Sequence, residues 1–168
     1  MTRRGIVGGL LVLNGCGFRP LYKPVAGGGS TVELGHIYVP VIQERSGQLL
    51  RQALQQRFDG SDAGHERKYE LIAALQIGFE GVAIQRDSST SRIRIDGFAT
   101  WTLRALTPLR PVLSQGTSRV LDGYNVTDQQ FFAAELESDS AIRRITGSLA
   151  DQVTIQVSSY FLKQAQAT

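Results

Sequence analysis

The stretch Tyr69–Phe79, with the sequence YELIAALQIGF, decides the fold because apolar residues occupy every second position along it. Successive side chains of an extended chain point to opposite faces, so one face of this segment is continuously apolar. The positions that share this face are Tyr69, Leu71, Ala73, Leu75, Ile77 and Phe79. We therefore predict a long β-strand with one buried face.

A second segment repeats the pattern after a polar turn. Gly81 shifts the phase of the first strand, and the polar sequence Arg86–Arg92 follows it. Beyond this turn, apolar residues alternate again with polar ones, at Ile93, Ile95, Ala99, Trp101 and Leu103. Two strands of this kind, joined by a polar turn, predict a long hairpin with one apolar face.

Two further strands are predicted on either side of the hairpin. Pro108 and Pro111 bracket a turn, after which Val112–Leu121 is predicted to be a strand. Upstream, Thr31–Ile42 is rich in β-branched and apolar residues and changes phase near Gly35. We predict a strand with a bulge there.

Helical periodicity appears in two places. A helix capped by Ser46 and ended by Gly60 is predicted from the stripe Leu49, Leu50, Ala53, Leu54 and Phe58. The segment Thr127–Gln130 has capping-box spacing and precedes a long helix that runs to Phe161, with a possible break near Ser138. Its apolar stripe is Ala141, Ile145, Leu149, Val153, Val157 and Tyr160.

The order strand, helix, three strands, helix predicts the fold class. We expect an α+β, two-layer sandwich in which a four-stranded, mostly antiparallel sheet carries both helices on one face. Residues 31–168 are enough for a single domain with one core.

The N-terminus is typical of an exported protein. Arg3 and Arg4 precede the short apolar run Ile6–Leu13, as in a signal peptide, and this run is too short to span a bilayer. The sequence Leu13-Asn14-Gly15-Cys16 that follows resembles the lipobox of bacterial lipoproteins. We expect residues 1–15 to be removed, Cys16 to be acylated, and the Gly- and Pro-rich residues 16–30 to form a flexible tether.

Composition disfavours several other classes of protein. Loss of Arg3 and Arg4 with the signal peptide would leave 16 of the 18 basic residues against 15 acidic ones, and this near balance argues against nucleic-acid binding. The single cysteine permits no internal disulfide, and His36 and His65 have no partners at metal-ligand spacing, so no metal or other cofactor is expected. Nucleophile motifs such as Gly-x-Ser-x-Gly are missing, so an enzyme is not expected.

The lipobox runs directly into Cys16–Tyr22, and this start resembles that of the lipopolysaccharide-assembly lipoproteins, the LptE family. Three later segments are also similar to that family, namely Ile37–Val39, Arg45–Leu50 and Ala141–Arg144. The long hairpin with basic residues at its tip adds to this resemblance.

The resemblance implies an outer-membrane lipoprotein, anchored through Cys16 and facing the periplasm. Its partners would be the LptD-type β-barrel translocon, which it plugs and helps to assemble, and lipopolysaccharide. Arg86 matches a basic family position implicated in lipid contact, with Arg92 and Arg94 beside it. Ordinary protection of a strand end by charge is the alternative reading of these arginines.

Two other functions stay open at this point. One is the auxiliary lipoprotein of an ABC-type lipid transport system, which also combines a lipobox with an α+β domain. The other is a lipoprotein hydrolase, which the missing nucleophile argues against. Co-purification with a barrel-type partner would separate the first reading from both.

Overall fold

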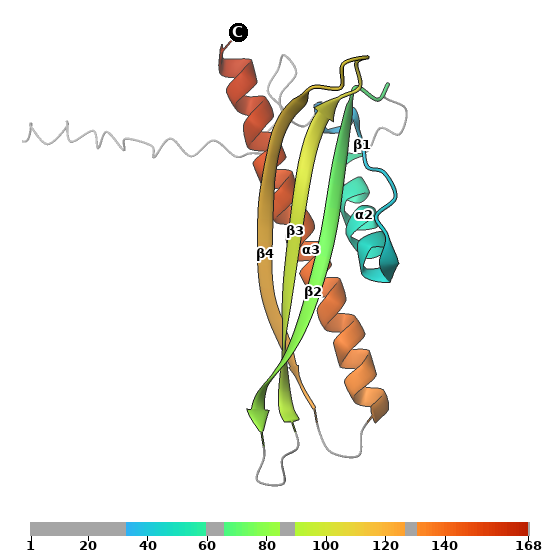
Figure 1. Ribbon diagram of the computed structural model, residues 1–168, viewed down its shortest axis with the longest axis vertical. Coiled ribbons are helices and arrows are strands. Elements are labelled where there is room, and N and C mark those ends of the chain that lie inside the picture. The colour runs from blue at the N-terminus through green and yellow to red at the C-terminus, as the bar shows by residue number, and fades with distance from the viewer. Residues whose placement is uncertain (1–32, 60–65, 85–89, 127–130, 168) are drawn as a thin grey trace, which may run out of the picture.

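The computed structural model describes residues 33–59, 66–84, 90–126 and 131–167. Its elements along the chain are β1 (Ile37–Tyr38), α2 (Glu44–Phe58), β2 (Tyr69–Ile84), β3 (Thr90–Ala105), β4 (Val112–Asn125) and α3 (Phe131–Ala167). The strands form one sheet in the order β1-β2-β3-β4 (Figure 1). β1 pairs with β2 in parallel, and the other two pairs are antiparallel.

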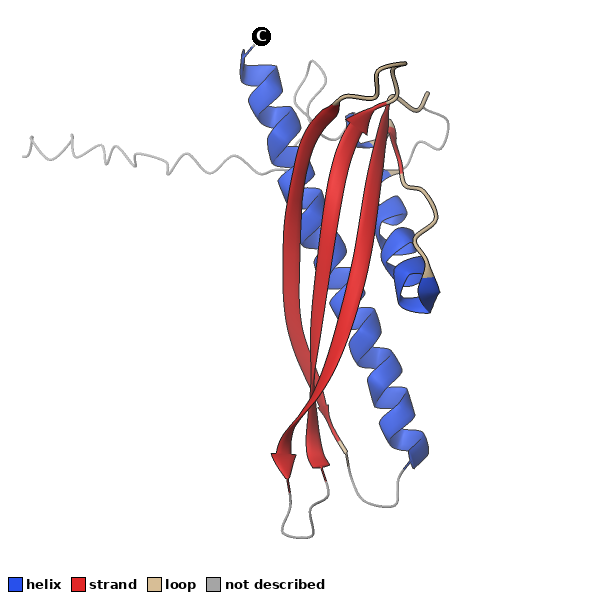
Figure 2. Ribbon diagram, in the orientation of Figure 1, coloured by secondary structure: helices blue, strands red, loops and turns tan. Residues whose placement is uncertain are grey.

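The predicted fold class is confirmed. Figure 2 shows the two long helices on the same side of the sheet, with α3 crossing behind the strands along the length of the molecule. The opposite face of the sheet, which we call the uncovered face, carries no helix among the described residues. The molecule is therefore a two-layer α+β fold with a mostly antiparallel sheet.

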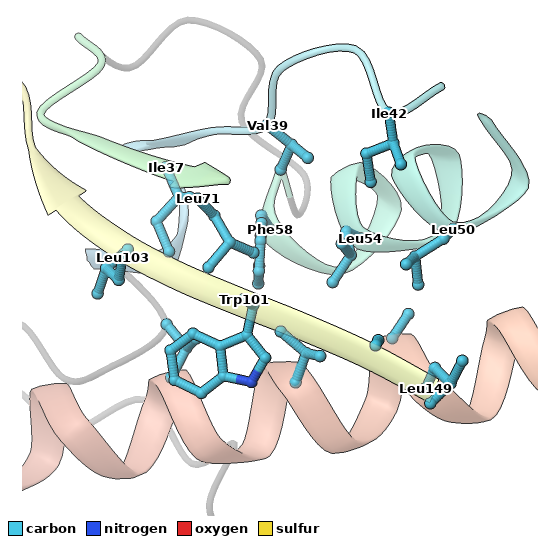
Figure 3. Packing of buried hydrophobic residues seen from close by; sticks show 14 of the residues in the cluster. Ile37, Val39, Ile42, Leu50, Leu54, Phe58, Leu71, Trp101, Leu103 and Leu149 are labelled. Carbon is cyan, nitrogen blue, oxygen red and sulfur yellow. The ribbon is translucent and has the colours of Figure 1, made fainter. Parts of the chain in front are cut away.

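The alternation of β2 and β3 explains how the layers meet. The register places Leu71 opposite Leu103 and Ala73 opposite Trp101, so the apolar sides of both strands face the helices together. Leu54 and Phe58 of α2 and Leu149 of α3 pack onto this face (Figure 3). Each of these helix and strand side chains is buried, except that Ala73 is partly exposed. The predicted buried face is thus confirmed from Tyr69 to Ile77, where the side chains are buried or partly buried, whereas Phe79 near the hairpin end is 55% exposed and that part of the prediction is wrong.

The strands of the hairpin extend beyond their predicted ends, and their pairing is irregular near the turn. β2 continues to Ile84, and its pairing with β3 shifts register between Gly81 and Ile84, where the sequence predicts a change of phase. β4 also continues beyond the predicted end at Leu121, because Asp122 and Tyr124 still pair with β3. The sheet therefore extends as far as the hairpin turn on all three long strands.

The predicted strand Thr31–Ile42 is wrong for most of its described length. Glu33 and Leu34 form a helical turn, and pairing with β2 is limited to the two residues of β1. Four of its apolar residues are nevertheless buried, Leu34, Ile37, Val39 and Ile42, whereas Val41 is 69% exposed. The Arg51 side chain donates to the Val39 carbonyl at 3.1 Å, so a side chain satisfies a backbone group that strand pairing would otherwise use.

The helix boundaries also differ from the predicted ones. α2 begins at Glu44, so Ser46 lies inside the helix, and its N-cap residue Gln43 makes no side-chain capping bond. α3 runs without interruption through Ser138. The predicted capping box at 127–130 and the helix end at Gly60 lie outside the described residues.

One tyrosine ties the start of the described chain to the start of β2. The Tyr69 hydroxyl donates to Glu33 Oε2 at 2.9 Å, and its ring contacts that of Phe161 at a centroid distance of 5.0 Å. Burial, the hydrogen bond to Glu33 and the charge of Glu33 raise the pKa of Tyr69 to about 12. Because this pKa lies above its ordinary value, Tyr69 stabilises the folded chain at neutral pH, and that contribution is lost as the pH rises through 12.

We therefore expect the free energy of unfolding to fall more steeply for the wild type than for Tyr69→Phe between about pH 9 and about pH 12. Urea unfolding at each pH measures this, and absorbance at 295 nm follows tyrosine ionisation in parallel. Parallel stability curves for the two proteins would contradict the assignment.

Candidate functional site

The end of the uncovered face at which β2 and β3 are joined carries two of the three arginines of β3, Arg92 and Arg94. Since alternate residues of a strand share a face, Arg92, Arg94 and Asp96 point away from the helices, while Ile93 and Ile95 point toward them. The sheet register places Arg94 between Glu80 of β2 and Gly123 of β4. Two arginines two positions apart therefore lie side by side on one surface.

These arginines line a shallow cavity of about 370 Å³, which we call the hairpin pocket. Its lining combines charged, apolar and backbone surface, from Val82, Arg92, Arg94, Leu121, Asp122 and Gly123. Val82 and Leu121 are both exposed. A side chain at Gly123 would place its Cβ 2.7 Å from the Ile93 carbonyl oxygen, so β3 and β4 approach too closely there for any other residue.

The arginines around the pocket differ in how they are paired. Arg94 forms an ion pair with Glu80, and next to the pocket Arg119 donates from Nε to both oxygens of Asp96, at 2.9 and 3.1 Å. Among the residues that the structure describes, Arg92 has no carboxylate at ion-pair distance. Its guanidinium group is the one available to an external anion without breaking such a pair.

Asp122 anchors the pocket to the helix layer. Arg144 of α3 donates to Asp122 Oδ2 at 2.7 Å, and the Gly123 amide donates to Oδ1 at 2.7 Å. Burial raises the pKa of Asp122, but these hydrogen bonds and the charges of Arg144 and Arg92 outweigh that effect, so the pKa lies below its ordinary value. The carboxylate is therefore ionised at neutral pH, and it holds β4 to α3 beneath the pocket.

The structure brings together two of the predicted site residues. Arg92 and Arg94 share the hairpin pocket, whereas Arg86 and Cys16 lie outside the described residues. Sequence reasoning missed Asp122 and Gly123, because the strand was predicted to end at Leu121, and it did not place Leu121 or Val82 beside the arginines. The continued alternation of Val120, Asp122 and Tyr124, which all face α3, was the signal for the longer strand.

Other kinds of site find little support in the described part of the chain. No group of three or more His, Cys, Asp or Glu side chains there could hold a metal ion. His36 is buried and donates from Nδ1 to the Glu66 carbonyl at 2.6 Å, which is a structural role. No described helix is both long and apolar enough to cross a membrane.

Solved structures share this fold. A Caulobacter crescentus CB15 protein described as a lipoprotein is 17% identical, with a TM-score of 0.62 over 79% of this chain and 95% of its own. Rare lipoprotein B of Shewanella oneidensis is 10% identical, with a TM-score of 0.56 over 77% of this chain and 98% of its own. An uncharacterized lipoprotein B of Nitrosomonas europaea is 12% identical, with a TM-score of 0.54 over 74% and 81%.

At such low identities these structures establish the fold alone. The sequence model of the lipopolysaccharide-assembly family LptE, however, matches residues 34–157. The chain belongs to the LptE family. A search of curated proteins finds no match.

The LptE match includes every residue of the hairpin pocket and reaches from the helical turn at Leu34 to Val157 of α3. The role of the chain is accordingly in lipopolysaccharide assembly. Membership of the LptE family also favours this reading over an auxiliary lipoprotein of an ABC-type transporter.

Proposed function

We propose that this LptE-family chain is an outer-membrane lipoprotein that plugs an LptD-type β-barrel, helps it to assemble and contacts lipopolysaccharide through the hairpin pocket. Residues 1–15 are the signal peptide, residues 16–30 the acylated start and tether, and residues 31–168 the domain. The observation that carries the lipid contact is the pocket itself, where Arg92 and Arg94 lie beside exposed Val82 and Leu121.

The chemistry of the pocket suits a phosphorylated lipid. Guanidinium groups match phosphate oxygens in pairs, and the neighbouring apolar side chains offer contact to hydrocarbon. Arg92 accepts a phosphate at the lowest cost, because Arg94 must share its charge with Glu80. Arg86, from the turn that joins these strands, is proposed to lead the contact.

The shape and charge of the domain support a plug. The 16 residues of β2 extend over roughly 53 Å, whereas the apolar band of an outer-membrane barrel is about 25 Å tall. The sheet is therefore long enough to run through the lumen of such a barrel. The uncovered face carries balanced pairs such as Arg119–Asp96, so it is compatible with the polar interior of such a barrel.

The lipid contact is tested by charge reversal. Arg92→Asp replaces an attraction to phosphate with a repulsion, and a charged hydrogen bond contributes about 1.5–3 kcal/mol, so we expect at least about tenfold weaker binding of lipopolysaccharide. Arg86→Asp is expected to act in the same direction. Arg92→Asp should still fold and co-purify with the barrel, because Arg92 is exposed, and the same is expected of Arg86→Asp.

Arg143→Asp is the matched control, since Arg143 is exposed on α3 and has no ion pair among the described residues. Binding of the purified protein to lipopolysaccharide is measured at low and high salt, because exposed charges are screened over about 10 Å at 0.1 M. If Arg92→Asp and Arg143→Asp bind as the wild type does, the chain is a structural plug without a lipid contact at this pocket.

A further inference from the structure

The end of the sheet opposite the hairpin pocket carries an exposed apolar turn, Leu106–Pro111, between β3 and β4. Leu109 at its tip is 91% exposed, more than any other large hydrophobic side chain that the structure describes. The Arg110 amide donates to the Thr107 carbonyl at 2.9 Å and closes a β-turn around Pro108 and Leu109.

The backbone of this turn is fixed by its dihedral angles and by hydrogen bonds. The backbone of Arg110 has a φ of 42°, a value that residues other than glycine rarely adopt. Two further backbone hydrogen bonds brace the turn, from Ala105 to the Pro111 carbonyl at 3.1 Å and from Leu106 to the Lys68 carbonyl at 2.8 Å. The exposure of Leu109 is therefore built into the fold.

The surroundings of Leu109 combine apolar and cationic side chains. Leu106 and Val112 flank the tip and are exposed. Arg110 and Lys68 add positive charge, and Arg110 meets Glu70 only at 3.6 Å with 61% of its side chain exposed. An apolar tip surrounded by cations matches the boundary of a phospholipid leaflet, where hydrocarbon lies just below a layer of phosphates.

The course of the chain identifies the occupant of this surface. Glu33, at the start of the described chain, accepts a hydrogen bond from the Tyr69 hydroxyl. The carbonyl of the neighbouring Lys68 accepts the hydrogen bond from the Leu106 amide of the turn. The chain that leads back to Cys16 therefore leaves the domain at the same end as Leu109. Cys16 and Glu33 are 17 positions apart in the sequence, and the tether predicted for this stretch would span roughly 20–25 Å on average.

We propose that the Leu106–Pro111 turn docks into the surface of the leaflet that holds the acyl chains of Cys16, with Leu109 inserted and Lys68 and Arg110 at the phosphates. This inference rests on the proposed lipidation of Cys16. One leucine and two cations bind a bilayer weakly by themselves, but the tether keeps them at high local concentration. Docking turns the hairpin pocket, at the far end of the sheet, away from that leaflet.

The test uses the acylated mature chain, from Cys16 to Thr168, in vesicles of phosphatidylethanolamine and phosphatidylglycerol. Leu109→Cys provides a thiol for an NBD fluorophore, because acylated Cys16 is the sole native cysteine and is blocked. Asn125→Cys, exposed at the hairpin end of β4, is the matched control. We expect blue-shifted emission at position 109 and about twofold quenching by shallow doxyl lipids, with neither effect at position 125.

Equal emission and no quenching at both positions would overturn the docking proposal. A blue shift at position 109 that requires the barrel and is insensitive to doxyl lipids would overturn it too, in favour of a protein contact. Reversal of charge in Lys68→Glu with Arg110→Glu is expected to reduce the quenching at position 109, and more so in vesicles with more phosphatidylglycerol.

Vesicle flotation distinguishes a failure of lipidation from a failure of the turn to dock. If the wild type does not float, the proposed acylation of Cys16 is wrong. The labelled Leu109→Cys chain is then tested with Cys16→Ser and an N-terminal hexahistidine held by nickel-chelating lipid. Quenching in that arrangement supports the turn independently of acylation, and its absence overturns the docking proposal.

Discussion

Replacing Cys16 with serine is expected to block acylation and signal-peptide removal and to leave the chain as an unprocessed precursor in the inner membrane. The Cys16 thiol is the proposed acceptor of diacylglycerol, and a hydroxyl group does not replace it in that transfer. Each buried CH₂ of an acyl chain contributes about 0.8 kcal/mol, so several chains make the normal anchor effectively permanent. The mass of the purified chain, palmitate labelling and extraction with alkaline carbonate measure the outcome.

Asn14→Ala is the control for this substitution, because it alters the same segment and keeps Leu13, Gly15 and Cys16. We expect this variant to be processed and retained like the wild type. Normal cleavage and membrane retention of Cys16→Ser would show that residues 1–15 are an ordinary signal peptide or that anchoring has another origin.

Trp101→Ala is expected to lower the free energy of unfolding by about 3–5 kcal/mol. Trp101 is 4% exposed, and its Nε1 donates to Gln156 Oε1 at 3.1 Å, while Gln156 Nε2 donates to the Thr117 carbonyl at 3.2 Å. The ring also lies over Gly116, where a Cβ would approach it to 2.7 Å. Truncation therefore leaves a cavity between sheet and helix and removes the bond that orients Gln156.

Two controls separate these effects in urea unfolding of the mature chain. Trp101→Phe keeps most of the buried ring but loses the hydrogen bond, so its effect should be smaller. Thr100→Ala changes the adjacent residue on the uncovered face and should alter stability by less than about 0.5 kcal/mol. Equal destabilisation by Trp101→Ala and Thr100→Ala would mean that the face assigned to β3 is wrong.

The sequence by itself determined the main architecture, because side-chain periodicity reports which face of an element is buried. The alternation in Tyr69–Phe79 predicts the central strand, and the repeat through Trp101 predicts its hairpin partner. It also places Arg92 and Arg94 together, since residues two apart on a strand share a face. For this reason, the site residues that lie close together in the sequence could be predicted.

Tertiary structure alone decided which distant residues complete the pocket and which apolar segments become strands. Periodicity does not specify the register between β3 and β4, which brings Gly123 opposite Arg94. Periodicity also does not reveal the hydrogen bond from Arg144 to Asp122, which depends on how α3 crosses the sheet. Leu34, Ile37 and Val39 are buried as expected, but burial of side chains does not make a segment a strand. Whether its backbone forms strand pairing depends on the edge of a neighbouring strand.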